Sequence, residues 1–307
     1  MKHIVVKLFA PIALACSLAT MARAESFARR LDVGGGRMMY IECHGSGSPT
    51  VVFDAGHRGR GDSWNVSDPA SRKATPVLAG VQQFTRVCSY DRPGTLVGST
   101  PKDFSRSDPV PMPRSADAAV TDLHELLSAA KIPGPYVLVG HSFGGLDILL
   151  YALNYPRSVA GIVFVDALPP ELRNQMTPSL WKTYSELNAQ PLPGIHYKEL
   201  ETMDFNASMD QVQRALARTT LPAIPIVVLA KDRRSDLAGL GTPAGFGEKV
   251  DAAWRRAQQQ LAASIAHVPL TAVETSHNVS VERPDVVIDA IRRVVDAVRS
   301  DRKTVIQ

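Results

Sequence analysis

The 307-residue sequence predicts an α/β fold in which helices cover both faces of a mainly parallel β-sheet. Three observations lead to this prediction. Short apolar segments typical of buried strands alternate with amphipathic segments that have helical periodicity. Hydrophobic residues make up 45% of the chain, which is enough for a sizeable core. Residues 136–150, YVLVGHSFGGLDILL, join a strand, a tight turn and an apolar helix without interruption.

The elements follow one another in a regular order. Alternation and flanking turn residues place strands at residues 37–43, 50–54, 85–90, 136–139, 159–165, 224–230 and 270–274. Helical periodicity places helices within 63–83, from Ser115 as N-cap to 131, from the turn after residue 139 to 155, at 250–265 and at 284–298.

One interval, residues 168–222, interrupts the alternation. It contains Pro169, Pro170, Pro178, Pro191 and Pro193 among scattered aromatic residues. Because a compact domain rarely contains so long a connection without structure of its own, we expect short helices here, including 178–188 and 209–218. These helices are expected to form a cap over the mouth of a site.

The first 24 residues have the pattern of a signal peptide. Lys2 and Lys7 precede an apolar stretch, 8–20, that is too short to span a bilayer, and an A-x-A cleavage site ends at Ala24. Cleavage after Ala24 would leave one domain, 25–307, in a bacterial periplasm or outside the cell, with no integral membrane segment. It would remove three basic residues and lower the formal charge from +4 to +1, so the sequence indicates no nucleic-acid partner.

The turn after residue 139 has the pattern of a nucleophile elbow. Ser142 is flanked by Gly140 and Gly144, two residues away on either side, where side chains would collide across a sharp bend. The helix that follows directs its N-terminal N–H groups at the same place, where they can stabilise negative charge. We therefore expect Ser142 to be the nucleophile of a serine hydrolase.

Three further segments carry a resemblance to a known family. They are VVFDAGH at 51–57, SYDRPG at 89–94, and Ser276-His277 followed by ERP at 282–284. Together with the elbow, they make the chain resemble the α/β-hydrolase superfamily over essentially its whole length after the leader. The resemblance implies an eight-stranded sheet with the helical cap inserted after strand six.

The resemblance implies that His277 is the base that activates Ser142. A carboxylate must hold that base in one tautomer, and two aspartates end strands: Asp166 and Asp232. Most relatives place the acid after strand seven, which favours Asp232. Asp166 resembles the strand-six acid of some haloalkane dehalogenases and is our preferred candidate, with Asp232 as the alternative.

The same comparison with the family implies an oxyanion hole formed by the backbone N–H groups of Phe143 and His57. The run HRGRG at 57–61 adds two arginines beside this hole. It admits two interpretations: a positively charged entrance for an anionic substrate, or a solvated loop, which we favour.

Cys43 and Cys88 are the cysteines that remain after the leader. If the family's strand order holds, they lie in adjacent strands and are close in space, where an oxidising compartment would permit a disulfide. A disulfide and two buried thiols are both compatible with the sequence.

Together these features predict an exported serine hydrolase that cleaves a small-molecule carboxylic ester, thioester or lactone through an acyl-enzyme, with no cofactor and no metal. A cofactor-free perhydrolase using the same triad is the alternative within enzymes. A small-molecule binding protein on the same fold, without turnover, is the alternative outside them.

Overall fold

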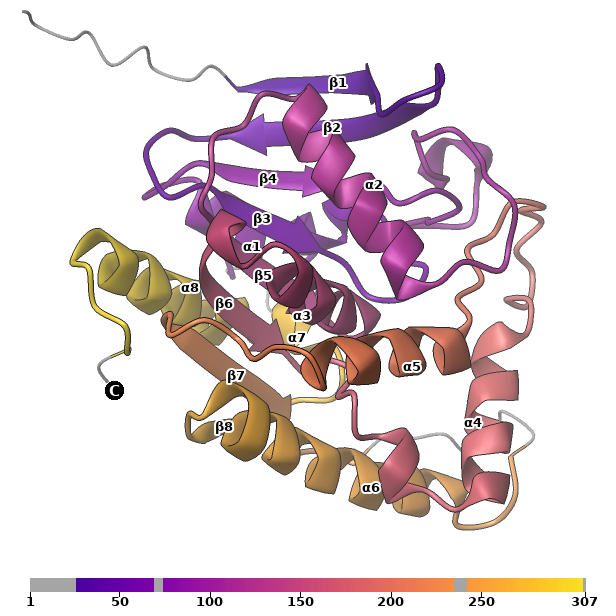
Figure 1. The fold of residues 1–307 in the computed structure, drawn as a ribbon. Helices are drawn as coiled ribbons and strands as arrows, with labels where there is room; N and C mark the ends of the chain where they lie inside the picture. Colours follow the sequence, from indigo (N-terminus) through magenta and orange to yellow (C-terminus); the bar gives the residue numbers. More distant parts are fainter. Residues whose placement is uncertain (1–25, 69–73, 235–241, 306–307) are drawn as a thin grey trace, which may run out of the picture.

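The chain forms a single mainly parallel sheet in a computed structural model that describes residues 26–68, 74–234 and 242–305. The eight strands of this described part are arranged in the order β1-β2-β4-β3-β5-β6-β7-β8. β2 runs antiparallel to β1 and β4, and the strands from β4 to β8 are parallel. The predicted fold class is therefore confirmed (Figure 1). The predicted signal peptide, 1–24, lies outside the described residues.

The strands and helices have the following bounds. The strands are β1 Phe27–Asp32, β2 Met38–His44, β3 Val51–Asp54, β4 Val87–Tyr90, β5 Tyr136–His141, β6 Val159–Val165, β7 Ile226–Lys231 and β8 Leu270–Val273. The helices are α1 Val77–Val81, α2 Ala116–Ala129, α3 Phe143–Asn154, α4 Pro178–Ala189, α5 Phe205–Leu216, α6 Phe246–Gln260, α7 Val279–Glu282 and α8 Pro284–Arg299.

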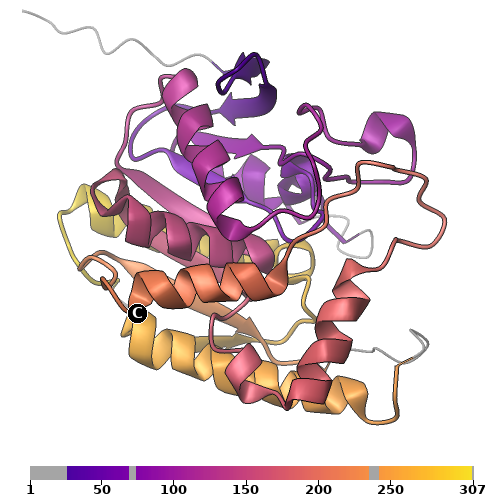
Figure 2. The same ribbon diagram turned by 45° about the vertical axis from the view of Figure 1, so that its right-hand side comes forward.

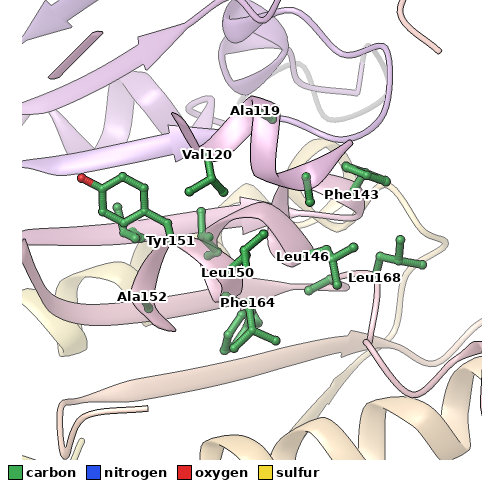
Figure 3. Packing of buried hydrophobic residues seen from close by; sticks show 14 of the residues in the cluster. Ala119, Val120, Phe143, Leu146, Leu150, Tyr151, Ala152, Phe164 and Leu168 are labelled. Atoms are coloured by element: carbon green, nitrogen blue, oxygen red, sulfur yellow. The ribbon is translucent and has the colours of Figure 1, made fainter. Parts of the chain in front are cut away.

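Two apolar layers cover the two faces of the sheet. Alternate residues of each strand point to opposite faces, so Val52 belongs to one layer while Val51 and Phe53 belong to the other. Helices α2, α3 and α6 pack on the first face, and α1 and α8 pack on the second. In Figure 3, Leu150 of α3 lies between Val120 of α2 and Phe164 of β6, and Leu146 lies beside Leu168.

Two local predictions differ from the structure. β1 was missed because most of its side chains are exposed, so the edge strand has no apolar alternation for a sequence pattern to detect. Ser115 precedes α2 as predicted, but its hydroxyl makes no capping bond. Instead the peptide N–H groups of Ala116 and Asp117 donate to side chains of α5, Ser208 and Gln211.

The interval 168–222, which we call the insertion, contains α4 and α5. Helix α5 packs against α3 on the outside of the first face, whereas α4 stands near α6 at one end of the sheet (Figures 1 and 2). Thr177 and Asp204 cap these two helices through their side chains. The insertion therefore has helical structure of its own. Within the described residues, no helix is long and apolar enough to cross a membrane.

Cys43 and Cys88 are joined by a disulfide. They face each other directly in the antiparallel β2–β4 pair, and both side chains are completely buried in the first apolar layer. The bond spans 45 residues of sequence and ties the antiparallel edge of the sheet to its parallel part.

Removal of this disulfide is expected to lower the free energy of unfolding by roughly 2–4 kcal/mol, because the open chain gains conformational entropy in the unfolded state. Urea unfolding of the C43A/C88A variant, compared with the oxidised wild type, measures the loss. The wild type should lose stability in reductant and the double variant should not. Free alkylation of both thiols in the folded, unreduced protein would contradict the bond.

Candidate functional site

Ser142 lies on a sharp bend between β5 and α3. Its backbone has φ 52° and ψ −121°. Residues other than glycine rarely adopt this backbone conformation, which costs about 1–3 kcal/mol. A Cβ on Gly140 would come within 2.5 Å of the carbonyl oxygen of Gly144. A Cβ on Gly144 would come within 2.4 Å of the Ala55 carbonyl oxygen. The glycines therefore permit the two close backbone approaches that hold the serine on its bend.

The two residues predicted to form the oxyanion hole lie beside this serine. Phe143 follows it at the start of α3. The loop after β3 packs against the bend, where a Cβ on Gly56 would be 3.2 Å from the Ser142 Cβ atom. His57 comes next in this loop, and its ring lies 6.2 Å from the ring of Phe143.

Asp166 contacts His277 directly. The aspartate follows β6 and is completely buried, and its Oδ2 atom lies 2.5 Å from His277 Nδ1. The histidine lies in the loop between β8 and α7. Because the carboxylate only accepts when ionised, Nδ1 carries the proton and Nε2 is left free to act as a base.

The other carboxylate oxygen of Asp166 is also well supplied with donors. Oδ1 accepts from Trp254 Nε1 at 2.9 Å, from the peptide N–H of Lys231 at 3.2 Å and from Gln258 Nε2 at 3.3 Å. Burial alone would raise the pKa of Asp166. The hydrogen bonds, led by the one from His277, outweigh it and lower the pKa below its usual value.

Asp232, the alternative acid, has a different position. It follows β7, its side chain is exposed, and its peptide N–H donates to the Val273 carbonyl. The structure therefore brings Asp166 to His277 and leaves Asp232 at the surface.

His141, the residue before Ser142, also contacts the histidine loop. Its Nε2 donates to the His277 carbonyl oxygen at 2.8 Å, so it restrains the backbone of His277. Burial, with a smaller effect of His277, lowers the pKa of His141 to about 4, and the ring is neutral at neutral pH. The elbow pattern leaves the residue before the serine unspecified, so the sequence alone did not single out His141.

The motif that follows His277 organises the same loop. The Glu282 carboxylate accepts from the hydroxyl and from the peptide N–H of Ser276, the residue before His277. It also pairs with Arg233 after β7. The loop that carries His277 is therefore held by a side chain of α7 as well as by His141.

A cavity of about 680 Å³ opens above Ser142 and His277. Its walls come from the end of α4, from the segment 190–193 that follows it, and from α6. The apolar lining residues are Tyr184, Leu187, Pro191, Leu192, Pro193, Phe246, Val250 and Trp254. Lys231 and Asp251, which also line it, form an ion pair of 2.7 Å.

The arginines beside the predicted oxyanion hole are buried and hydrogen-bonded to the chain. Arg58 and Arg60 are 8% and 7% exposed. The guanidinium of Arg58 donates to backbone carbonyls of the insertion, and that of Arg60 pairs with Asp62. The prediction of a solvated loop was therefore wrong: both arginines are buried and tie the loop to neighbouring segments, Arg60 through the carbonyls of Lys102 and Phe104. Arg58 also lines the cavity above Ser142, so a positively charged entrance stays a prediction. Within the described residues, no cluster of His, Cys, Asp or Glu could hold a metal ion.

The neutral state of His141 predicts a pH dependence of stability. Its folded pKa of about 4 lies below the ordinary value near 6.5. The unfolded chain therefore takes up the proton first, and the stabilisation is complete above pH 6.5 and is lost as the pH falls towards 4.

H141Q keeps a donor but does not titrate, so between pH 7 and 4 it should lose about 3 kcal/mol less unfolding free energy than the wild type. Urea unfolding at several pH values measures this difference. H196Q, which changes an exposed histidine of the insertion, is the matched control. Equal losses in H141Q and wild type would contradict the assignment.

Comparison of the sequence with those of known proteins finds several relatives. The uncharacterized protein YqjL of Bacillus subtilis is 24% identical over 202 residues, 62% of this chain and 65% of that protein. The putative carbamate hydrolase RutD of Escherichia coli is 34% identical over 119 residues, 39% of this chain and 38% of that protein. The chain spans 14% to 65% of the length of the first three curated relatives.

Solved structures share the fold at low identity. Carboxylesterase CesB from Bacillus subtilis matches with a TM-score of 0.53 and 14% identity, covering 88% of this chain and 91% of that one. Haloalkane dehalogenase DatA from Agrobacterium tumefaciens matches with a TM-score of 0.57 and 14% identity, covering 90% and 98%. The model of the alpha/beta hydrolase family matches residues 43–290, which is most of the chain. The chain belongs to the α/β-hydrolase family.

Proposed function

We propose that this hydrolase cleaves a carboxylic ester, or the related thioester or lactone, through an acyl-enzyme formed on Ser142. The observation that carries the proposal is the 2.5 Å contact between Asp166 Oδ2 and His277 Nδ1, in a cavity that His277 and Ser142 line together. A serine hydroxyl is a weak nucleophile by itself, and this arrangement supplies the base and the group that orients it.

In the proposed reaction, His277 Nε2 takes the proton of the Ser142 hydroxyl as the oxygen attacks the acyl carbon. Asp166 stabilises the imidazolium that forms and holds its Nδ1 proton. The oxyanion accepts from the N–H groups of Phe143 and His57, each of which contributes about 3 kcal/mol to lowering the barrier. His277 then gives the proton to the leaving group. In the second half of the reaction, water attacks the acyl carbon and gives a proton to His277, which passes it to the departing Ser142 oxygen.

The lining of the cavity indicates the substrate. Aromatic and aliphatic side chains dominate it, and its cations are already paired or hydrogen-bonded to the chain. We therefore propose a neutral ester with an apolar acyl or alkyl group, over which residues 168–222 act as a cap. We also propose export to the periplasm or beyond, with cleavage after Ala24 leaving the hydrolase domain 25–307.

S142A is expected to abolish ester turnover with the fold intact, because it removes one hydroxyl and leaves the glycines of the bend in place. A fluorophosphonate probe should label Ser142 of the wild type, identified by peptide mass spectrometry, and should not label S142A. Circular dichroism controls for folding. Ester turnover at the wild-type rate in purified S142A, or no labelling of folded wild type, would overturn the mechanism.

D166N should lower kcat by several orders of magnitude, because asparagine keeps the shape but favours the wrong tautomer of His277. D232N is the matched control: it neutralises an aspartate at the end of the neighbouring strand that is exposed to solvent. Its kcat should remain within about two-fold of the wild type. The reverse outcome, an active D166N and an inactive D232N, would transfer the orienting role to Asp232.

A further inference from the structure

Arg92, after β4, is buried beside the site without belonging to the triad. Its guanidinium is 2% exposed, and each of its five N–H groups has an acceptor. The Asp54 and Glu201 carboxylates take three of them, with Arg92 Nε 2.7 Å from Glu201 Oε1. The other two go to the carbonyl oxygens of Ala55, at 2.8 Å, and Gly56, at 2.7 Å.

The contact with the Gly56 carbonyl bears on the oxyanion hole. The C=O of Gly56 and the N–H of His57 belong to the same planar peptide unit. A donor that fixes the oxygen therefore fixes the direction of the N–H. Because Arg92 carries a positive charge, its hydrogen bond also polarises the unit and makes that N–H a stronger donor. A second bond to the same oxygen, from the Gly59 N–H at 2.9 Å, adds to this restraint.

Glu201, which belongs to the insertion, holds both Arg92 and the next peptide of the loop. Its Oε2 accepts from the peptide N–H of Arg58 at 2.6 Å, and its carbonyl accepts from Arg58 Nε at 3.1 Å. Burial would raise the pKa of Glu201, but Arg92 outweighs it and lowers the pKa, so the carboxylate stays charged. The peptides on both sides of His57 are therefore restrained by one ion pair between the insertion and the β4 turn.

We infer that Arg92 is a positioning residue for the oxyanion hole: it aims and polarises the Gly56–His57 peptide, and Glu201 of the insertion holds it in place. The inference rests on the proposed function, since it assigns the His57 N–H to the oxyanion.

The geometry requires arginine at this position. A planar guanidinium reaches two carboxylates and two carbonyls in fixed directions, whereas a lysine ammonium has three donors and no planar fork. R92K keeps the charge between Asp54 and Glu201, so no buried carboxylate is left without a cation. It loses the aimed bond to the Gly56 carbonyl.

The test compares an ester with its thionoester, in which sulfur replaces the carbonyl oxygen. Sulfur accepts hydrogen bonds more weakly than oxygen does. A weakened oxyanion hole slows the ester more than the thionoester. R92K is expected to lower kcat for the ester by about 10- to 100-fold, with KM within about two-fold, and to lower the ester-to-thionoester ratio of kcat by a similar factor. A merely structural role would leave this ratio unchanged.

R106K is the matched control, because Arg106 lies near the same turn and pairs with the buried Asp91. It should keep the wild-type ratio. E201Q is a second variant that keeps the shape of the glutamate, and it should lower the ratio by about 3- to 10-fold. If R92K does not fold, the ester-to-thionoester ratio of kcat in E201Q tests the positioning role instead.

A wild-type ratio in folded R92K, or in E201Q where R92K does not fold, would overturn the positioning role while ester turnover and labelling of Ser142 stand. If the wild type cleaves no ester, the proposed function and this inference fail together.

Discussion

The close approach between the nucleophile bend and the end of β3 is the constraint on which the site depends. Gly144 lies so near the Ala55 carbonyl that no side chain fits between them. This contact holds Ser142 at a positive φ and places the loop after β3 directly beside it. One packing requirement therefore positions both Ser142 and the backbone of the loop after β3.

Asp166 and His277 come from the ends of the two strands on either side of β7. Asp166 follows β6 and His277 follows β8, so the carboxylate must lie across the end of β7 to reach the imidazole. The peptide N–H of Lys231, at the end of β7, donates to Asp166, and Trp254 of α6 donates to the same oxygen. A buried carboxylate needs such partners to stay ionised, and here the neighbouring strand and helix provide them.

Features that depend on a local sequence pattern were predicted correctly. Features that depend on a contact with a residue far away in the sequence were not. The elbow, most strands and the insertion's helices follow from periodicity and glycine spacing. Asp166 and Asp232 look alike in sequence, since each ends a buried strand. Their burial and the donors from α6, β7 and His277 distinguish them only in the folded chain. The loop at 57–61 was predicted to be solvated, because the carbonyl acceptors of Arg58 come from residues 130 or more positions away.

Those acceptors connect the cavity wall to the loop after β3. Arg58 donates to the carbonyls of Asn188 and Gln190 in the cavity wall, and its own N–H is bound by Glu201. The wall that would contact the acyl group and the loop that would bind its oxyanion therefore share one arginine. The guanidinium of Arg58 is bonded to the wall, and its backbone N–H is bonded to Glu201. In this fold the insertion thus shapes the cavity and also restrains the loop after β3.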